Sequence, residues 1–554
     1  MMRSPTTFGR RPVSPMPDTS HILHLPDDVL TYLLDLTPMS DLESISKTCK
    51  QLRTICELVR VQYLQELNQE GLEYNPASAS STASFPQALA SLRCRENRWR
   101  TMRPITSSCR STLNESHFTS YSRKIVLYVS RQVASTIVHG DTVEHSTYRG
   151  RTDEVTRFHA ADVLQDLLVL LRMHLGTGVS YLCFLSLRGM SPHSAAASPT
   201  RVLLTSKISP LEYRSAPLHA HGLRILGPWC AVLTTDLSSK QLEAQVNILF
   251  LCNWKTGVLF KLAGFHPDKV DDFNFINSRT LAVIHKTLDL NPSQLILRLY
   301  EITLPSQLSS SACVTLRLSL RLPRIENRVS ISLSRMVLPR ALQEQVLQSN
   351  QRPREVFSAN SGIMALSIPL ATDVEKARLD IAINVAMLLS FARANDVPDC
   401  TMLWSEWGPR MSRVFLFNEV RAPNDVEPLQ DVEGYRIAFS ANVDRSDGRA
   451  GISEERSHPA AFILDFNPAS IQWAREEDKA GRGLRGALVT EPSVLQPGHL
   501  LAEEVVSSLP YTRTMLQGYL PQHQIRLSRD EVVYPAKPLQ GPPLHNLHNV
   551  YNFA

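Results

Sequence analysis

The chain has 554 residues, 43% of them hydrophobic, which suits two or more globular domains. Its 58 basic and 53 acidic residues leave a formal net charge of only +5, which excludes a general polyanion-binding surface. Nine cysteines without a Cys-x-x-Cys pair favour a reducing compartment. Residues 1–20 lack the apolar core of a secretory signal, and the longest apolar run, 381–392, is too short to span a bilayer. We therefore expect a soluble intracellular protein, cytoplasmic or nuclear, that binds neither membranes nor nucleic acids.

Residues 22–60 predict a compact pair of helices. Pro26 suits the first helical turn because it has no N–H group to lose there. Pro38 ends this helix, and Ser40 with Glu43 predicts a capping box that begins the second one. A module this small cannot bury much apolar surface alone. It either packs against the rest of the chain or offers its apolar face to a partner.

Both predicted helices carry an apolar stripe at helical spacing. Val29, Leu30 and Leu33 form the stripe of the first helix. The stripe of the second helix consists of Leu42, Ile45, Cys49 and Leu52.

Together with the Leu25-Pro26 pair, these stripes resemble the F-box, the small helical module that binds the Skp-type adaptor of cullin-based ubiquitin ligases. The resemblance covers about the first tenth of the chain, and the family often has Val where Thr48 stands. A helical hairpin packed on its own domain is the alternative. The resemblance implies that ten residues bind the adaptor: Leu25, Pro26, Val29, Leu30, Leu33, Leu42, Ile45, Thr48, Cys49 and Leu52.

A polar, small-residue linker is predicted at 75–84, followed by a helix over residues 85–102. On this helix Trp99 lies on an apolar face, and we expect a solvated face of arginines opposite it; a nuclear-import or nucleic-acid patch is the alternative. Fungal F-box proteins have a similar Arg- and Trp-containing segment after the F-box, which implies a connecting helix. The arginines are Arg93, Arg95, Arg98, Arg100 and Arg103.

From about residue 120 onward, recurrent short apolar runs separated by turn residues predict strands, for example at 181–187, 280–285 and 413–418. No long amphipathic helices alternate with them, which argues against a parallel α/β sheet. The segment around Trp254 and Gly257 is similar to the strand–turn–strand order of a WD-repeat propeller blade, although Lys255 replaces the usual Asp. No clean repeat of about forty residues emerges. We expect a degenerate β-propeller, with other all-β layouts as the alternative.

Several segments read as insertions between strands or as a loose tail. The insertions are 191–200, 340–355, 444–459 and 477–483, and the tail is 536–554.

The sequence contains no GxSxG, P-loop, GxGxxG or HExxH motif. His219 and His221 are expected to be a surface pair, since no third metal ligand is evident. Asp271-Asp272 could suggest a pair of catalytic acids, but adjacent strand residues point to opposite faces and cannot share one substrate atom. The pair is therefore expected to cap a turn. Two tryptophans, at 404 and 407, predict a core-anchoring turn, with a recognition edge as the alternative.

These features predict an α+β multidomain protein in which a small all-α module precedes a large all-β domain. The expected function is that of the substrate-recognition subunit of an SCF-type E3 ubiquitin ligase, a receptor and not an enzyme, without cofactor or metal. Its partners would be the Skp-type adaptor, a cullin through it, and an unknown protein substrate. A scaffold without ligase output and a propeller enzyme are the alternatives. The expected segments are a disordered tail (1–20), the F-box module (21–68), a linker with its helix (69–119), the β-rich domain (120–535) and the loose tail (536–554).

Overall fold

A computed structural model of the chain describes residues 25–35, 44–70, 72–74, 84–101, 106–112, 118–122, 125–129, 133–139, 142–148, 154–162, 165–174, 177, 179–187, 189–205, 222–236, 246–262, 268–287, 294–303, 313–331, 334–338, 355–357, 362–373, 376–395, 400–418, 429–444, 457–480, 487–516, 525–527, 531–535 and 546–552. Outside them lie the predicted N-terminal tail, the predicted linker at 75–84 except for Ser84, the capping box at 40–43 and the histidine pair at 219 and 221. By its contacts the chain divides into two units: Met1–Gln69 with Ala83–Leu92, and Glu70–Thr82 with Arg93–Ala554.

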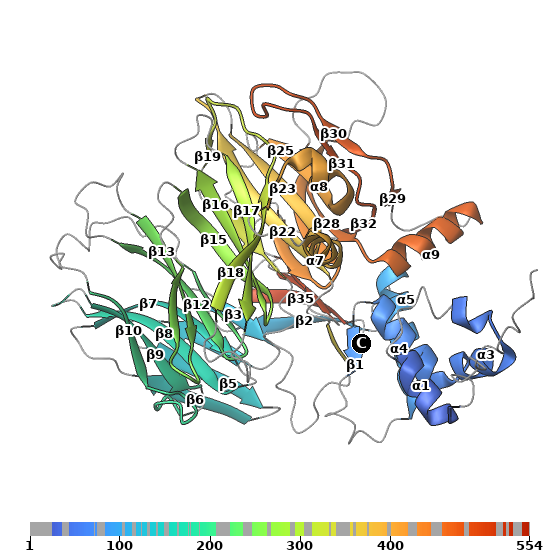
Figure 1. Cartoon of the computed structure of the whole chain (residues 1–554), viewed down its shortest axis with the longest axis horizontal. Helices are drawn as coiled ribbons and strands as arrows, with labels where there is room; N and C mark the ends of the chain where they lie inside the picture. Colours follow the sequence, from blue (N-terminus) through green and yellow to red (C-terminus); the bar gives the residue numbers. More distant parts are fainter. Residues whose placement is uncertain are drawn as a thin grey trace, which may run out of the picture. The chain divides into compact units, whose positions relative to one another are not determined.

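The first unit is helical (Figure 1). The first part of α5 belongs to it and buries Ala88, Leu89 and Leu92, while the ring of Phe85 lies 5.8 Å from that of Tyr63. The helices are α1 (Asp27–Asp35), α3 (Lys50–Cys56), α4 (Val59–Gln69) and α5 (Phe85–Thr101), of which α5 ends in the second unit.

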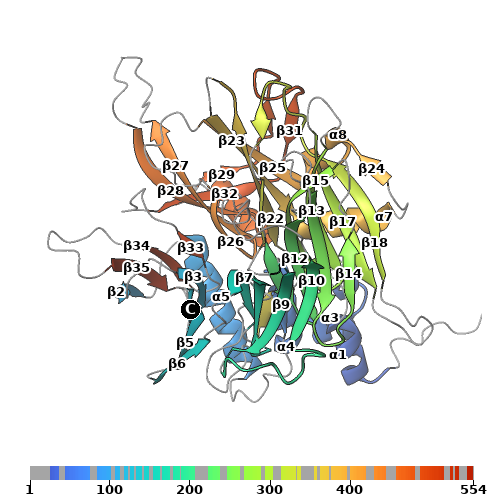
Figure 2. The ribbon, with the colours of Figure 1, turned by 90° about the vertical axis from the view of Figure 1, so that its left-hand side faces the viewer.

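The second unit consists mainly of antiparallel sheets, seven of which have four or five strands in the part of the chain described. One of them joins β2 to the last three strands of the chain in the order β2-β35-β34-β33, and Figure 2 shows β2, β34 and β35 side by side. These strands are β2 (Thr106–Thr112), β33 (Arg526–Leu527), β34 (Glu531–Pro535) and β35 (Asn546–Asn552).

The next four sheets follow the chain as antiparallel meanders, and the fourth gains a parallel fifth strand, β24 (Cys400–Met402), beside β18. The first two contain β3 (Phe118–Ser122), β4 (Ile125–Val129), β5 (Val133–His139) and β6 (Thr142–Tyr148), then β7 (Glu154–Asp162), β8 (Leu167–His174), β9 (Val179–Ser186) and β10 (Thr200–Thr205). The next two contain β11 (Leu223–Leu226), β12 (Trp229–Asp236), β13 (Val246–Asn253) and β14 (Leu259–Leu262), then β15 (Asp268–Asn277), β16 (Thr280–Thr287), β17 (Leu295–Thr303) and β18 (Cys313–Arg321).

Two further sheets hold helices in their connections. The first contains β19 (Ser330–Ile331), β20 (Arg335–Val337), β22 (Ile363–Ala371), β23 (Lys376–Asn384) and β25 (Ser412–Asn418), with α7 (Val385–Ala394), β24 (Cys400–Met402) and α8 (Trp404–Met411) between β23 and β25. The second contains β26 (Leu429–Glu433), β27 (Arg436–Asp444), β28 (Ser457–Asp465), β29 (Ala487–Val489) and β32 (Tyr511–Leu516), with α9 (Pro468–Lys479) after β28. Two small pairs are β1 (Leu72–Tyr74) with β21 (Glu355–Phe357) and β30 (Ser493–Leu495) with β31 (Val505–Ser507).

From the sheet that begins with β7 onward, each sheet contacts the next one. In chain order β7 contacts β11, β11 and β13 contact β15, β15 contacts β20, β22 contacts β26, and β26 contacts β33. Each sheet keeps two open edges in the described residues. The observed class is therefore a small helical module followed by a β-rich region of antiparallel sheets.

The chain around Trp254 has the predicted order of strand, turn and strand. β13 ends at Asn253, whose side chain accepts hydrogen bonds from the backbone N–H groups of Lys255 and Thr256 at 3.1 Å. Gly257 has a φ of +75°, a left-handed value that favours glycine. Trp254 is buried and donates from Nε1 to the carbonyl of Gly227 at 3.0 Å. The predicted strand–turn–strand unit is confirmed.

The expectation for Asp271 and Asp272 is wrong, because both lie within β15 and cap no turn. The register of β15 shifts between Val270 and Asp272, a bulge that interrupts the alternation of faces. Both carboxylates accept backbone N–H groups from one segment of the next sheet: Asp272 from Met336 at 2.7 Å and Asp271 from Ser334 at 3.4 Å. The pair therefore fastens two sheets together.

At a second bulge, too, an Asp carboxylate accepts a backbone N–H group from the neighbouring sheet. The register of β26 shifts between Leu429 and Asp431, and Asp431 accepts the N–H of Leu527 in the neighbouring sheet at 3.0 Å. Asp431 and Asp272 each also accept the N–H of the residue that follows them. An apolar-x-Asp-apolar segment at a bulge thus occurs twice and each time bonds two sheets together. We call this contact an inter-sheet clasp.

The two tryptophans at 404 and 407 anchor the core, as predicted, but they do so from a helix, α8. Their rings meet edge to face at 4.9 Å, and Trp407 donates from Nε1 to the carbonyl of Arg321 at 3.0 Å. Gly408 fits beneath Trp404, where an added Cβ would lie 2.4 Å from the indole ring. The prediction of a turn missed the helix that Glu406 starts by accepting the N–H of Leu403.

Three further expectations differ from the structure. The predicted tail contains β35, which is paired on both sides, and the expected linker contains β2 and the start of β3. The arginines of α5 are not all solvated, since Arg95 is 7% exposed and Arg100 contacts Glu70. Trp99 is buried, as expected. Arg103 lies outside the described residues.

Candidate functional site

Three short helices of the first unit form the candidate site. The N–H groups of Val29 and Leu30 donate to the carbonyl of Pro26 at 3.0 Å, so α1 begins directly after this proline. The predicted second helix is interrupted: Thr48 donates from its hydroxyl to the carbonyl of Ile45, and Cys49 has an extended backbone. Cys49 then caps α3, its sulfur accepting the N–H of Leu52 at 3.4 Å.

The inner face of this module is a small apolar core. Leu30 and Leu34 of α1 pack against Ile55 and Cys56 of α3, and all four are buried. Burial, followed by the nearby Glu57 carboxylate, raises the pKa of the Cys56 thiol, which keeps it protonated. Leu25, Ile45 and Leu52 are partly buried against this core.

The outer face carries apolar side chains that the module leaves exposed. Val29 and Leu33, one turn apart on α1, are each 38% exposed. Leu58 and Val59, between α3 and α4, are 43% and 37% exposed. These are four of the ten large hydrophobic residues that are exposed in the described residues, so the short module holds a disproportionate share of them.

The structure sorts the ten predicted contact residues by accessibility. Leu30 is 1% exposed and stabilises the module from inside, and Leu42 lies outside the described residues. The remaining eight are Pro26, Val29, Leu33 and Thr48, which are exposed, and Leu25, Ile45, Cys49 and Leu52, which are half-buried. Leu58 was missed by the sequence reasoning, although its place beside Val59 between the polar Glu57 and Arg60 is a visible apolar signal.

A scan against family models decides what this module is: the F-box domain matches residues 22–62. The chain carries an F-box domain. F-box domains bind Skp-type adaptors, and their proteins generally act as non-catalytic substrate receptors. No curated protein matches the chain.

Among the described residues, no group of three or more His, Cys, Asp or Glu side chains is arranged to hold a metal ion. The helices described include none that is both long and apolar enough to cross a membrane.

Proposed function

We propose that this chain is the substrate-recognition subunit of an SCF-type ubiquitin ligase, and that its F-box recruits the Skp-type adaptor. The observation that carries the proposal is the exposure of Val29 and Leu33 on α1 within the segment that matches the F-box. The two residues are spaced i and i+4, the spacing with which a helix anchors itself in an apolar groove. Their burial would be completed by the adaptor.

The ten predicted residues divide the work of adaptor binding. Val29 and Leu33 are the central anchors, because they are the exposed large hydrophobic side chains among the ten. They lie on α1, which Leu30 holds in place by packing into the core of the module. Pro26 and Thr48 extend the contact at the exposed ends of this face. The half-buried residues Leu25, Ile45, Cys49 and Leu52 would line the edge of this contact face. Leu42 would also contribute to it.

The β-rich region would hold a protein substrate, and we propose that its sheets are the blades of a seven-bladed propeller. Three observations support this arrangement: each large sheet has four or five strands, nearly all antiparallel; the sheets from β7 onward contact one another in chain order; and β2 joins the last three strands. Pairing β2 with the last strands of the chain would close the ring. The clasps at Asp272 and Asp431 would hold neighbouring blades together.

In the proposed role, the chain brings the substrate close to the ubiquitin-transferring machinery and does no chemistry itself. It would hold substrate near a cullin-bound ubiquitin-conjugating enzyme, so the covalent chemistry belongs to other subunits. The site of action would be the cytosol or the nucleus, where the adaptor and cullin are available.

A binding measurement with purified adaptor tests the proposal. Val29→Asp/Leu33→Asp places two charges on the exposed face and spares the inner core, so the variant should fold and bind the adaptor about a hundredfold or more weaker. The matched control is Val494→Asp, which adds a charge at a 47% exposed valine of β30 in the second unit and should bind normally. Equal binding by the double variant and the wild type, or no binding by the wild type, contradicts the proposal.

A further inference from the structure

An apolar surface lies where two neighbouring sheets of the second unit face each other. β25 of one sheet contributes Phe415 and Phe417, whose ring centres lie 5.2 and 5.5 Å from that of Phe439 on β27 of the other. Across its sheet Phe439 pairs with Phe462 of β28, and Phe462 pairs with Met515 of β32. Because paired residues lie on the same side of a sheet, the five side chains form one continuous surface. We call it the aromatic face.

The aromatic face is buried at its centre and open at its margin. Phe439 is 3% exposed, whereas Phe415, Phe417 and Phe462 are half-buried. Met515 is 57% exposed, the largest value among the exposed large hydrophobic residues of the described part of the chain. β29 ends its pairing with β32 two residues before Met515. Aromatic rings and methionine are enriched in protein–protein interfaces, so this margin has the composition of a docking surface.

The accessible charges beside the aromatic face are positive. The register places Lys376, Arg378 and Asp380 on this side of β23, Arg413 on this side of β25 and Arg513 on this side of β32. Asp380 is 1% exposed and Arg413 is 4% exposed, so both are inside the fold. Lys376 and Arg513 are exposed and Arg378 is half-buried. On these three strands, a partner would therefore meet only cations.

Arg513 is the cation closest to the apolar margin. Its guanidinium carbon lies 5.6 Å from the ring centre of Phe462, a cation–π contact, and it shares its side of β32 with Met515. Within the described part of the chain, neither Arg513 nor Lys376 forms an ion pair. A carboxylate brought by a partner would find both cations accessible.

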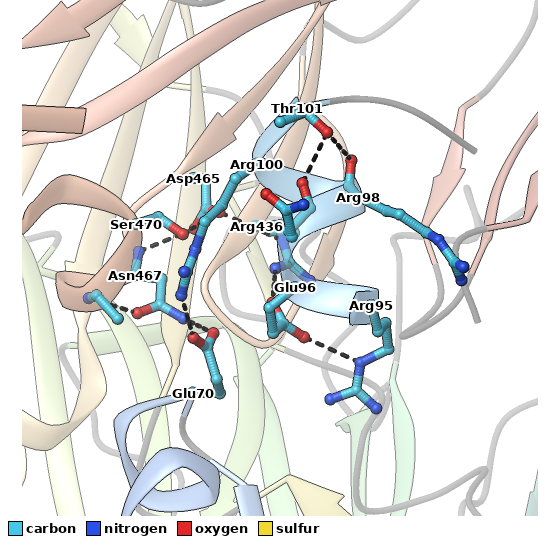
Figure 3. A network of polar contacts seen from close by, with 12 residues as sticks. Glu70, Arg95, Glu96, Arg98, Arg100, Thr101, Arg436, Asp465, Asn467 and Ser470 are labelled. Carbon is cyan, nitrogen blue, oxygen red and sulfur yellow. Dashed lines mark hydrogen bonds and ion pairs between the residues drawn. The ribbon is translucent and has the colours of Figure 1, made fainter. Parts of the chain in front are cut away.

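A buried network elsewhere in the second unit shows how the chain matches arginines inside the fold (Figure 3). Arg436 donates from Nη2 to Oε2 of Glu96 at 2.7 Å and from Nε to Oδ2 of Asp465 at 3.4 Å. Glu96 also accepts Nε of Arg95 at 3.0 Å. Each of these arginines has a carboxylate partner in the fold, whereas the two accessible cations described above find none among the described residues.

We propose that the aromatic face and its cations are a docking surface for protein substrates, and that the occupant is a peptide segment with a large apolar side chain next to Asp or Glu. The apolar side chain would pack on Phe462 and Met515, and the carboxylate would pair with Arg513, which lies beside both. Charge complementarity carries the acidic part of this assignment. The proposal rests on the receptor function proposed above and names the class of substrate that the receptor takes.

The same residue types also occur in single-strand nucleic-acid sites, where bases stack on exposed rings beside basic side chains. Here the most exposed member of the aromatic face is a methionine, which offers no ring for stacking. The rings themselves are half-buried or buried. An apolar peptide side chain therefore fits this face better than a base.

Selection of displayed peptides against the full-length protein tests the docking surface. The probe is a phage library of short random peptides. The wild type should enrich peptides in which Asp or Glu adjoins Phe, Leu or Met. The variant Arg513→Glu/Met515→Ser should bind these peptides at least about tenfold more weakly, because it reverses the accessible charge and removes the exposed apolar side chain.

The matched control is Arg201→Glu/Val202→Ser, which makes the same two changes at an exposed arginine and a 53% exposed valine on β10. This control should bind the enriched peptides like the wild type. The proposal is overturned if no peptide is enriched, if the enriched peptides lack acidic residues, or if they bind Arg513→Glu/Met515→Ser as tightly as the wild type. Displacement of the peptides by single-stranded oligouridylate would assign the face to nucleic acid and contradict the proposal.

Folding and adaptor binding are measured on the same variants. If Arg513→Glu/Met515→Ser fails to fold, Arg513→Gln decides alone: weaker peptide binding supports the docking surface, and unchanged binding contradicts it. A folded Arg513→Glu/Met515→Ser should bind the adaptor normally, because its F-box is unaltered. A wild type that binds the adaptor but enriches no acidic peptide overturns only the docking surface. One that binds acidic peptides but no adaptor contradicts the receptor function instead.

Discussion

At the scale of single residues, burial separates side chains that look alike in the sequence. Val29, Leu30 and Leu33 form one predicted stripe, yet Leu30 is inside the F-box module and the other two are outside. Helical spacing groups apolar residues but does not say which of them face the core when two adjacent faces are apolar. Arg436 and Glu96 are 340 positions apart, so no local pattern in the sequence could pair them.

The acid stability of the chain should depend on Glu96. Its pKa is lowered to about 2 in the folded state, so it contributes stability above pH 4.5 that is lost as the pH falls from 4.5 towards 2. Glu96→Gln should therefore unfold more easily at pH 7, by about 3 kcal/mol, since the buried Arg436 loses one of its two carboxylate partners, Glu96 and Asp465. Denaturant unfolding between pH 2.5 and 7 measures this. The expected difference from wild type shrinks with acid, and a constant difference would contradict the assignment.

At the scale of elements, the strands were largely predictable and the helices of the β-rich region were not. The apolar runs at 181–187, 280–285 and 413–418 coincide with β9, β16 and β25. The run 381–392, in contrast, changes from β23 to α7 in its middle, where Asn384 caps the helix by accepting the N–H of Met387 at 3.0 Å. An apolar run has the same composition in a buried strand and a buried helix, so only the cap marks the change.

The packing of α8 gives an element-scale prediction. Gly408→Ala should destabilise the second unit by about 1–3 kcal/mol, because the new methyl group would overlap the indole of Trp404. Gly498→Ala is the matched control, since no atom lies within 4 Å of the position its Cβ would take. Thermal unfolding of both variants measures the difference. Equal melting temperatures would show that Trp404 moves aside at little cost.

At the scale of the whole molecule, the decisive pairing joins the two ends of the β-rich region. β2 and β35 are separated by more than four hundred residues, and neither carries a marked apolar alternation. The sequence-based prediction therefore placed β2 in a linker and β35 in a loose tail. Long-range pairing of weakly patterned strands is invisible to local periodicity, whereas the F-box module, whose signal is local, could be predicted.

Ring closure in the proposed propeller can be tested through β35. Val550 pairs with Ser108 of β2 and Val533 of β34, so Val550→Pro removes a ladder hydrogen bond from a strand paired on both sides. A closed ring should lose about 3 kcal/mol or more of unfolding free energy. Lys261→Pro, on the edge strand β14, is the control and should cost less. If Val550→Pro unfolds like the control, the end strands do not hold the domain closed.

In the proposed function, residues 22–62 recruit the ligase while the β-rich region selects the substrate. Affinity purification of the full chain, followed by quantitative mass spectrometry, tests it most directly. The wild type should recover the Skp-type adaptor and a cullin together with a set of further proteins. Val29→Asp/Leu33→Asp should lose the adaptor and the cullin and keep the further proteins, at equal or higher abundance. Recovery of adaptor and cullin by the double variant at wild-type levels, or their absence from the wild-type sample, would contradict the account.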